Sequence, residues 1–429
     1  NTSEEGMTLE VDIEYPESLH DLHNDYPLCP EQMVVKDKDL SEYQHSLYSK
    51  LHPDKVGKIV NSSPKLIGSL YNKKNYVVHY RYLKMCERLG LKITKFHRAI
   101  SYKQQPFLKQ FIEFNTKLRS LAKTKFEQDM FKLMNNSVYG KTMEDVMKRI
   151  NFDLINDKKL AEKRIAKPTY KRHVKFNDNL VGIHMMKAKI VLDKPIYLGQ
   201  CILDESKLDM SIFHYDVMKE KYGEKAKLLF TDTDSFAYEI ETEDLYKDIS
   251  EMSEKFDLSN YPNISNKDRQ ELKNKGVEVN IDNHPLYSST NKKQLHKMKD
   301  ELGGNIMTEF VGLRSKMYSY DTIETSQIQK IREMNNLLKD ENKQVKYNGS
   351  DSRAKGIARS AKNKLKHQHY LNCIENEETT TSKFMGIRSK NHILSTKSIT
   401  KVGLSPYDDK RFICEDRIST LAYGHYKIL

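Results

Sequence analysis

Two aspartates lie one residue apart where an apolar segment of the chain ends. The apolar run at 228–230 predicts a buried strand and the run at 237–240 predicts a second one, so Asp232 and Asp234 lie in the turn between two strands. Residues two apart on an extended chain share a face, so the two carboxylates repel each other unless a cation lies near them. Hard oxygen ligands in small number favour Mg²⁺. The alternative is a solvated hairpin tip built from turn-forming residues.

A helical face upstream carries groups suited to a nucleotide. Lys132, Asn136 and Tyr139 recur at spacings of four and three residues, so they share one face of a helix. They offer an ammonium for a phosphate, an amide for a base or sugar edge, and a ring that packs on a flat surface. Gly140 would let another backbone approach, or simply end an ordinary amphipathic helix. Three further cations extend the positive face, or form a solvated surface: Lys117, Arg119 and Lys123.

A third stretch, "GLRSKMYSY", predicts a strand with a nucleic-acid-binding face. Lys316 and Tyr318 alternate onto one side of this strand, together with Arg314. An ammonium and an aromatic ring placed in this way could hold a sugar-phosphate backbone. Surface lysines and tyrosines on a half-exposed strand are also common.

The composition indicates a globular chain with a phosphate-rich partner. The 429 residues are 38% hydrophobic, and 72 basic against 60 acidic side chains give a net charge of +12. Five scattered cysteines without zinc spacing favour an intracellular, reducing compartment and argue against a zinc site. The chain has no apolar run of about 18 residues, so no membrane partner is expected.

The remaining pattern predicts mixed helices and strands. We expect a mostly irregular or extended lead-in over about the first 60 residues and a polar, turn-rich excursion at 245–300. Strands are expected at 76–80, 92–102, in short pieces at 150–195, and at 309–323. Helices are expected at 81–90, as a pair joined near 122–124, at 196–223, and in the basic region beyond 330.

The order of three motifs resembles the family B DNA polymerases. The chain reads K-x-x-x-N-S-x-Y-G from Lys132 to Gly140, then D-T-D-S from Asp232, then K-x-Y from Lys316. The segments "KLMNNSVYGKTME", "AKLLFTDTDSFAYEIET", "EFVGLRSKMYS" and "LSPYDDKRFI" look like the protein-primed branch of viruses and of Polinton (Maverick) transposons. The resemblance runs through most of the chain.

This resemblance implies an α+β fold of the right-hand type, with an antiparallel palm sheet and helical fingers and thumb. The implied segments are a partial palm lead-in at 1–104, fingers at 105–145, a protein-primed-type insertion at 146–195, palm with the catalytic hairpin at 196–334, and thumb at 335–429.

The resemblance also implies a reaction, a template-directed transfer of a nucleotide to a primer 3'-hydroxyl with two Mg²⁺ ions. Asp234 would be the principal metal ligand with Asp232 assisting, while Lys132 would contact phosphates and Asn136 and Tyr139 the nascent base pair or sugar. Partners would be primer-template DNA, deoxynucleoside triphosphates and a terminal priming protein, in a nucleus or at a viral replication site. The implied DNA contacts are Ser137, Gly140, Arg314, Lys316, Tyr318, Arg353, Lys355 and Gly356.

A basic cluster near the C-terminus fits a thumb that grips duplex backbone. Lys355-Gly356-Ile357 resembles a thumb motif of the family, and a solvated helix surface is the alternative. The cluster comprises Arg353, Lys355, Arg359, Lys362, Lys364, Lys366, His367 and His369.

The chain departs from the family pattern in its missing upstream aspartate motif. Asp12 precedes Tyr15-Pro16 without the Ser-Leu pair, and "HSLYSK" has Tyr43 where the aspartate belongs, so both look like chance matches. We therefore expect that the chain begins after this motif and after any exonuclease domain. With Asp232 and Asp234 alone, one metal would be under-coordinated, and we expect weak binding and nearly no activity.

Two other function classes stay open. A non-catalytic nucleic-acid-binding protein, either a transposon remnant or a domesticated scaffold, would keep a salt-dependent DNA affinity without the two aspartates. A reverse-transcriptase-type enzyme would need two adjacent aspartates, whereas Thr233 separates Asp232 from Asp234 in this chain. Enzymes of that type also lack the helix with the Asn-Ser-x-Tyr-Gly motif.

Overall fold

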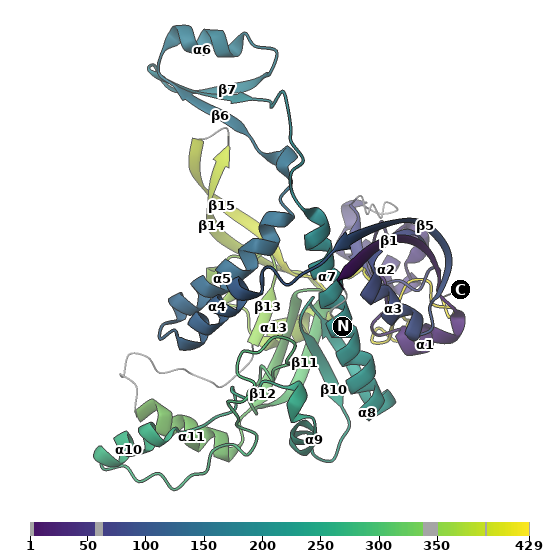
Figure 1. Cartoon of the computed structure of the whole chain (residues 1–429), viewed down its shortest axis with the longest axis vertical. Coiled ribbons are helices and arrows are strands. Elements are labelled where there is room, and N and C mark those ends of the chain that lie inside the picture. Colours follow the sequence, from purple (N-terminus) through teal and green to yellow (C-terminus); the bar gives the residue numbers. More distant parts are fainter. Residues whose placement is uncertain (1–3, 56–62, 338–350, 391–392, 429) are drawn as a thin grey trace. The chain divides into compact units, whose positions relative to one another are not determined.

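The computed structural model describes residues 4–55, 63–337, 351–390 and 393–428 (Figure 1). The chain divides into two compact units. The first unit comprises Asn1–Pro106, Asp204–Thr381 and Val402–Leu429, and the second comprises Phe107–Leu203 and Ser382–Lys401. Helices mix with sheets whose described strand pairs are antiparallel, which confirms the α+β expectation. The division into palm, fingers and thumb stays a prediction.

The N-terminal sheet of the first unit is more regular than the irregular or extended lead-in that we expected. Strand β1 (Glu5–Glu14) lies in the middle of the order β4-β1-β5, between β4 (Lys73–His79) and β5 (Lys92–Lys103). Val11 and Ile13 of β1 are buried, while the neighbouring Glu10 pairs with Arg98 and Asp12 pairs with His97, both on β5. Buried apolar residues and acidic residues therefore alternate along this part of β1, as in a half-buried strand. The high content of acidic residues made this pattern hard to recognise in the sequence.

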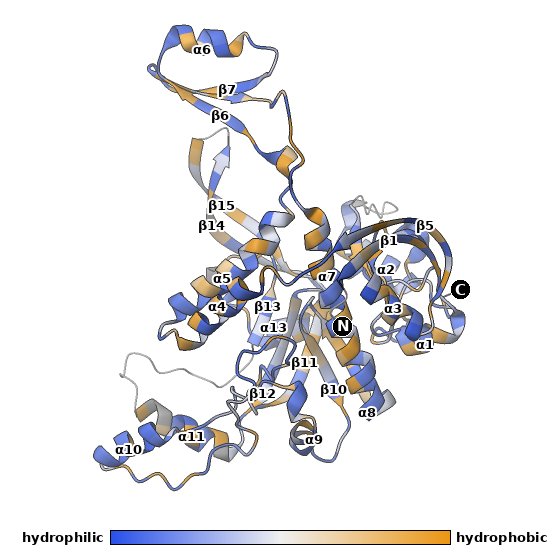
Figure 2. Cartoon of the chain, viewed as in Figure 1, coloured by the Kyte–Doolittle hydropathy of each residue, from blue (hydrophilic) through white to orange (hydrophobic). Residues whose placement is uncertain are grey.

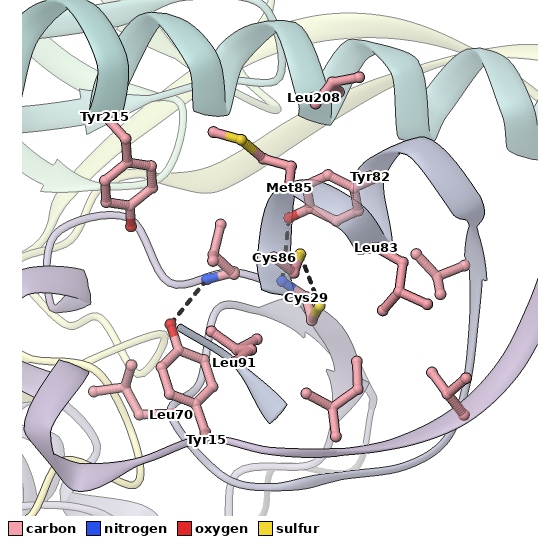
Figure 3. Packing of buried hydrophobic residues seen from close by; sticks show 14 of the residues in the cluster. Tyr15, Cys29, Leu70, Tyr82, Leu83, Met85, Cys86, Leu91, Leu208 and Tyr215 are labelled. Atoms are coloured by element: carbon pink, nitrogen blue, oxygen red, sulfur yellow. Dashed lines mark hydrogen bonds between the residues drawn. The ribbon is translucent and has the colours of Figure 1, made fainter. Parts of the chain in front are cut away.

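The largest core cluster of this unit packs under the N-terminal sheet (Figure 3). Helix α3 (Tyr80–Arg88) contributes Tyr82 and Cys86, and the Cys29 nitrogen donates a hydrogen bond to the Tyr82 hydroxyl at 3.2 Å. The sulfurs of Cys29 and Cys86 lie 3.6 Å apart as free thiols. Smaller elements of this region are α1 (His20–His23), β2 (Glu31–Met33), α2 (Glu42–Leu51), β3 (Lys65–Ile67), β16 (Phe412–Ile413) and β17 (Thr420–Leu421).

The helix expected at 196–223 is present and leads into the acidic hairpin. Helix α7 (Ile196–Ser211) continues through a π-helical stretch at Ile212–Lys219 into α8 (Glu220–Tyr222). Gly223 has a φ of +54°, which suits the residue that ends the helix. The chain then forms β9 (Ala226–Thr231) and β10 (Phe236–Ile240), which pair with each other as expected.

A second sheet, β11-β12-β13, follows in the first unit. Its strands are β11 (Ile306–Arg314), β12 (Met317–Ile323) and β13 (Asp351–Ala354), so the strand expected at 309–323 is a hairpin. Helix α13 (His367–Glu375) packs on this sheet, and Tyr370 and Cys373 join Val311 and Leu313 in one buried cluster. The remaining helices are α9 (Leu245–Glu251), α10 (Asn266–Asn274), α11 (Ser326–Leu337) and α12 (Arg359–Lys362).

The expected polar excursion at 245–300 has a core of its own. Phe256, Leu258 and Tyr261 are buried together with Ile249 of α9 and Leu286. Its surface is polar, as the sequence indicates, but a few apolar residues far apart in the chain suffice to order it.

The second unit holds the expected helix pair. Helix α4 (Lys109–Leu121) packs along α5 (Lys125–Thr142), and Asn135 donates to the Thr116 hydroxyl at 3.3 Å (Figure 1). Helix α6, absent from our expectation, accompanies the short strands expected at 150–195. The other elements of this unit are β6 (Asn151–Ile155), α6 (Lys158–Ile165), β7 (Tyr170–Asn177), β8 (Leu180–Met185) and the hairpin of β14 (Thr380–Lys390) and β15 (Ile393–Leu404). Across the described part of the chain, no helix is long and apolar enough to cross a bilayer.

Candidate active site

The two aspartates lie, as expected, in a turn between β9 and β10, but this turn is tight and the shared face of an extended segment does not apply to them. The Asp232 nitrogen donates to the Ser235 carbonyl at 3.0 Å, and the Asp234 nitrogen donates back to the Asp232 carbonyl at 2.6 Å. Thr233 between them has a φ of +60°, a left-handed conformation that is unusual for a β-branched residue. Such a conformation costs about 1–3 kcal/mol and is concentrated at functional sites. The turn thus holds both carboxylates on one short loop.

Lys316 reaches this loop from a second turn. We expected Lys316 on a strand face, but β11 ends at Arg314 and β12 begins at Met317, so Lys316 lies in the connecting turn with a φ of +61°. Its Nζ lies 2.7 Å from Oδ1 of Asp232, and both side chains are partly exposed. The ammonium therefore neutralises one of the two carboxylates in the structure.

Tyr318 joins the acidic hairpin to the second sheet. Its ring stacks on Phe230 of β9 with a centroid distance of 4.3 Å, and Phe310 of β11 lies 5.8 Å from the same Phe230 ring. Burial raises the pKa of the Tyr318 hydroxyl, and the charge of Arg353 opposes that rise. The stack holds the hairpin against β12, because an aromatic pair adds about 0.5–1.5 kcal/mol to the free energy gained from burial of its surface.

A hollow of about 250 Å³ opens where these elements meet. The Lys355 nitrogen donates to the Lys316 carbonyl at 3.2 Å, and Arg353 lies opposite Tyr318 in the β12–β13 ladder, which brings the C-terminal basic segment to the two turns. One carboxylate thus faces four cations, so the hollow is electropositive and suits a phosphate. Its lining residues are Asp232, Lys316, Tyr318, Arg353, Ala354, Lys355 and Lys362.

Asp234 differs from Asp232 in its surroundings. Its side chain is exposed, and no described residue pairs with its carboxylate. Within the described residues, no third acidic or histidine side chain completes a ligand group around the two aspartates. The pair nevertheless suits Mg²⁺, which binds proteins through one or two carboxylates and completes its shell with water and substrate phosphates.

The expected alternatives for an upstream aspartate have other roles. Asp12 on β1 accepts a hydrogen bond from the Asn75 nitrogen at 2.8 Å and contacts His97 at 2.8 Å. The Asn75 N–H and then the His97 side chain lower the pKa of Asp12. Tyr43 and the Ser-Leu-Tyr segment after it lie on α2, where Leu47 is buried. That both matches arise by chance stays a prediction.

The helical face expected to bind the nucleotide is present on α5 in the second unit. Lys132 and Asn136 are exposed and Tyr139 is half-buried, while Ser137 donates to the Met134 carbonyl at 2.8 Å. A methyl group at Gly140, which lies inside the helix, would meet no atom within 4 Å. Figure 2 shows hydrophobic residues interspersed with hydrophilic ones along α4 and α5. That this face approaches the aspartates stays a prediction, as do the nucleotide contacts of Lys117, Arg119 and Lys123.

The basic cluster of the C-terminal region is mostly exposed, with one correction. His367 is only 6% exposed and faces β11 and β12, so it does not belong to a DNA-gripping surface. Lys364, Lys366 and His369 are accessible, and the side chain of Arg359 lies outside the described residues. Gly356 has a φ of +90° and follows Lys355 at the rim of the hollow. Sequence reasoning missed Phe230 and Phe310 as the aromatic support of Tyr318, although both lie in segments that were expected to be strands.

Comparisons with known proteins give one distant likeness. No protein-family model matches the chain, and a search of curated proteins finds no match. Among solved structures, the chain is similar to "Phi29 DNA polymerase complexed with primer-template DNA and incoming nucleotide substrates (ternary complex)", with a TM-score of 0.47 and 12% identity. The likeness covers 93% of this chain and 58% of that polymerase, so the chain spans less than two thirds of its length. A likeness at this level carries no functional conclusion.

Proposed function

We propose that the chain is a DNA-directed DNA polymerase of the protein-primed family B type, and that Asp232 and Asp234 are its metal-binding carboxylates. The observation that carries this proposal is the hollow in which Asp232 meets Lys316, Tyr318 and Lys355. These residues come from three distant segments of the chain, and each segment has a family motif. Random surface motifs have no reason to converge on one electropositive depression.

The chemistry assigned to the site is in-line attack of a primer 3'-hydroxyl on the α-phosphate of a nucleotide, with release of pyrophosphate. Two divalent ions held by Asp232, Asp234 and the triphosphate would lower the pKa of the attacking 3'-hydroxyl and stabilise the negative charge on the leaving pyrophosphate. Most of the protein's contribution to such a transfer is position and charge.

The acidic turn and the main polar residues of the hollow then have defined tasks. Asp234, which has no described partner, is available as an oxygen ligand. In the absence of metal, the Lys316 ammonium pairs with the Asp232 carboxylate at 2.7 Å. When the carboxylate binds a metal ion, the Lys316 ammonium becomes free to contact a phosphate of the primer. Arg353 and Lys355 add phosphate contacts along the primer, and the stacked ring of Tyr318 keeps the two turns in register.

A primer-extension assay tests this proposal. Under single-turnover conditions with excess protein, Mg²⁺ and a labelled primer-template, we expect slow incorporation that Asp234→Asn abolishes. Glu239→Gln is the matched control, because Glu239 is an exposed carboxylate on β10 of the same hairpin. Incorporation that persists in Asp234→Asn would contradict the assignment of the metal ligand.

The net positive charge of the hollow also favours a second candidate, a non-catalytic nucleic-acid-binding protein. This candidate predicts a DNA affinity that falls with salt and survives the double change Asp232→Asn/Asp234→Asn, with no incorporation by the unchanged chain. Measurement of DNA affinity at several salt concentrations, alongside the extension assay, separates the two.

A further inference from the structure

A second group of possible metal ligands lies on the opposite face of the β11-β12-β13 sheet from Tyr318. Glu309 of β11 and Asp321 of β12 are cross-strand partners, and His367 of α13 covers them. One ligand atom from each of the three side chains lies within 4.8 Å of the others. Like charges placed directly opposite each other destabilise an antiparallel pair, so this arrangement needs a compensating positive charge.

The hydrogen bonds of His367 fix which ring nitrogen faces the carboxylates. The Ser319 hydroxyl donates its only proton to the Asp351 carbonyl at 3.0 Å, so it must accept from Nδ1 of His367, also at 3.0 Å. Nδ1 therefore carries a proton, and in the neutral ring Nε2 is a bare lone pair. This Nε2 atom is buried and has no hydrogen-bond partner among the described residues. It lies 3.2 Å from Oε2 of Glu309.

A bare lone pair and two carboxylates pointing at one another repel, and either a proton on Nε2 or a metal ion between the three groups removes this repulsion. We propose that Glu309, Asp321 and His367 bind a divalent transition-metal ion. Imidazole with carboxylates suits Mn²⁺, Fe²⁺ or Zn²⁺ better than Mg²⁺. At metal–ligand distances of about 2.0–2.2 Å, neighbouring ligand atoms lie roughly 3.0–3.5 Å apart, which agrees with the 3.2 Å separation.

The surroundings of the three ligands match those of metal sites. A metal-bound histidine almost always donates its other N–H to an oxygen that fixes its orientation, as His367 does to Ser319. Two carboxylates and a neutral imidazole also balance the charge of a divalent ion. The ion would link α13 to β11 and β12. The opposite face of these two strands carries Phe310 and Tyr318, which pack against Phe230 beside the candidate active site.

The test uses the full chain with Asp232→Asn/Asp234→Asn, so that the candidate active site does not contribute. Mn²⁺ is titrated and followed by electron paramagnetic resonance, and pulsed measurements detect coupling of the bound ion to ¹⁴N. We expect one bound Mn²⁺ with an imidazole ¹⁴N signal. The further change His367→Gln should remove that signal and weaken binding at least about tenfold.

Two controls keep the test decisive. His296→Gln removes an exposed histidine that pairs with a single aspartate in the same unit, and it should leave the signal unchanged. Thermal unfolding in chelator shows whether each variant folds, and Asp321→Asn provides a second variant that keeps the histidine. Bound Mn²⁺ without ¹⁴N coupling, or binding that survives both His367→Gln and Asp321→Asn, would overturn the proposal.

Discussion

Replacement of Lys316 by methionine should strengthen metal binding at the acidic turn. The Lys316 ammonium contacts Asp232 at 2.7 Å and so competes with a divalent ion for the same oxygen. Both side chains are partly exposed, so solvent screening limits the pair to about 0.5–1 kcal/mol. Loss of the competitor should therefore tighten metal affinity about two- to fivefold. Methionine keeps the length of the stem and removes only the charge.

The assay is a Mn²⁺ titration of the full chain at low ionic strength, in a His367→Gln background that removes the proposed second metal site. The gain should shrink as salt is added, because the displaced ion pair is exposed. Lys362→Met is the matched control, since Lys362 lines the same hollow without an ion pair to Asp232, and it should change affinity less than twofold. Unchanged or weaker affinity in Lys316→Met would refute the competition between the ammonium and the metal.

Three further changes test the packing around the site and the core. Tyr318→Ala should lower the free energy of unfolding by about 1–2 kcal/mol through loss of the stack on β9, whereas Tyr318→Phe should cost less than about 0.5 kcal/mol, as measured by urea denaturation. Gly424→Ala should cost about 3 kcal/mol or more in the same assay, because Gly424 has a φ of +88° and the new Cβ would lie 2.8 Å from the Tyr71 nitrogen. Burial lowers the pKa of His23 to about 4 and that of His214 to about 3. The unfolded chain therefore binds more protons below about pH 6.5, so stability should fall as the pH drops, by up to about 1.4 kcal/mol per pH unit for each histidine, and a flat profile from pH 7 to 4.5 would contradict this.

The local elements of the site could be predicted from the sequence. The apolar runs on either side of Asp232 and Asp234 predicted the β9–β10 hairpin, and the spacing of Lys132 and Asn136 predicted the helix α5. Both predictions were possible because these patterns depend only on residues close together in the chain. Strand β1 was missed because its buried residues alternate with acids that pair with β5.

Contacts between distant segments were harder to predict. The turn conformation of Lys316 depends on where the β11–β12 register ends, and no periodicity in the sequence defines that point. His367 looked like one member of a basic run, yet packing of α13 on the sheet buries it beside Glu309. Burial of this kind follows from tertiary contacts, which composition alone does not specify.

The most direct test of the proposed function is nucleotide binding to the chain in complex with a primer-template that ends in a dideoxynucleotide, measured with and without Mg²⁺. We predict that binding of the next correct nucleotide requires Mg²⁺, weakens at least about tenfold in Asp232→Asn and in Asp234→Asn, and is unchanged in Glu239→Gln. Nucleotide binding that is independent of Mg²⁺ and of both aspartates would contradict a catalytic role for the acidic turn.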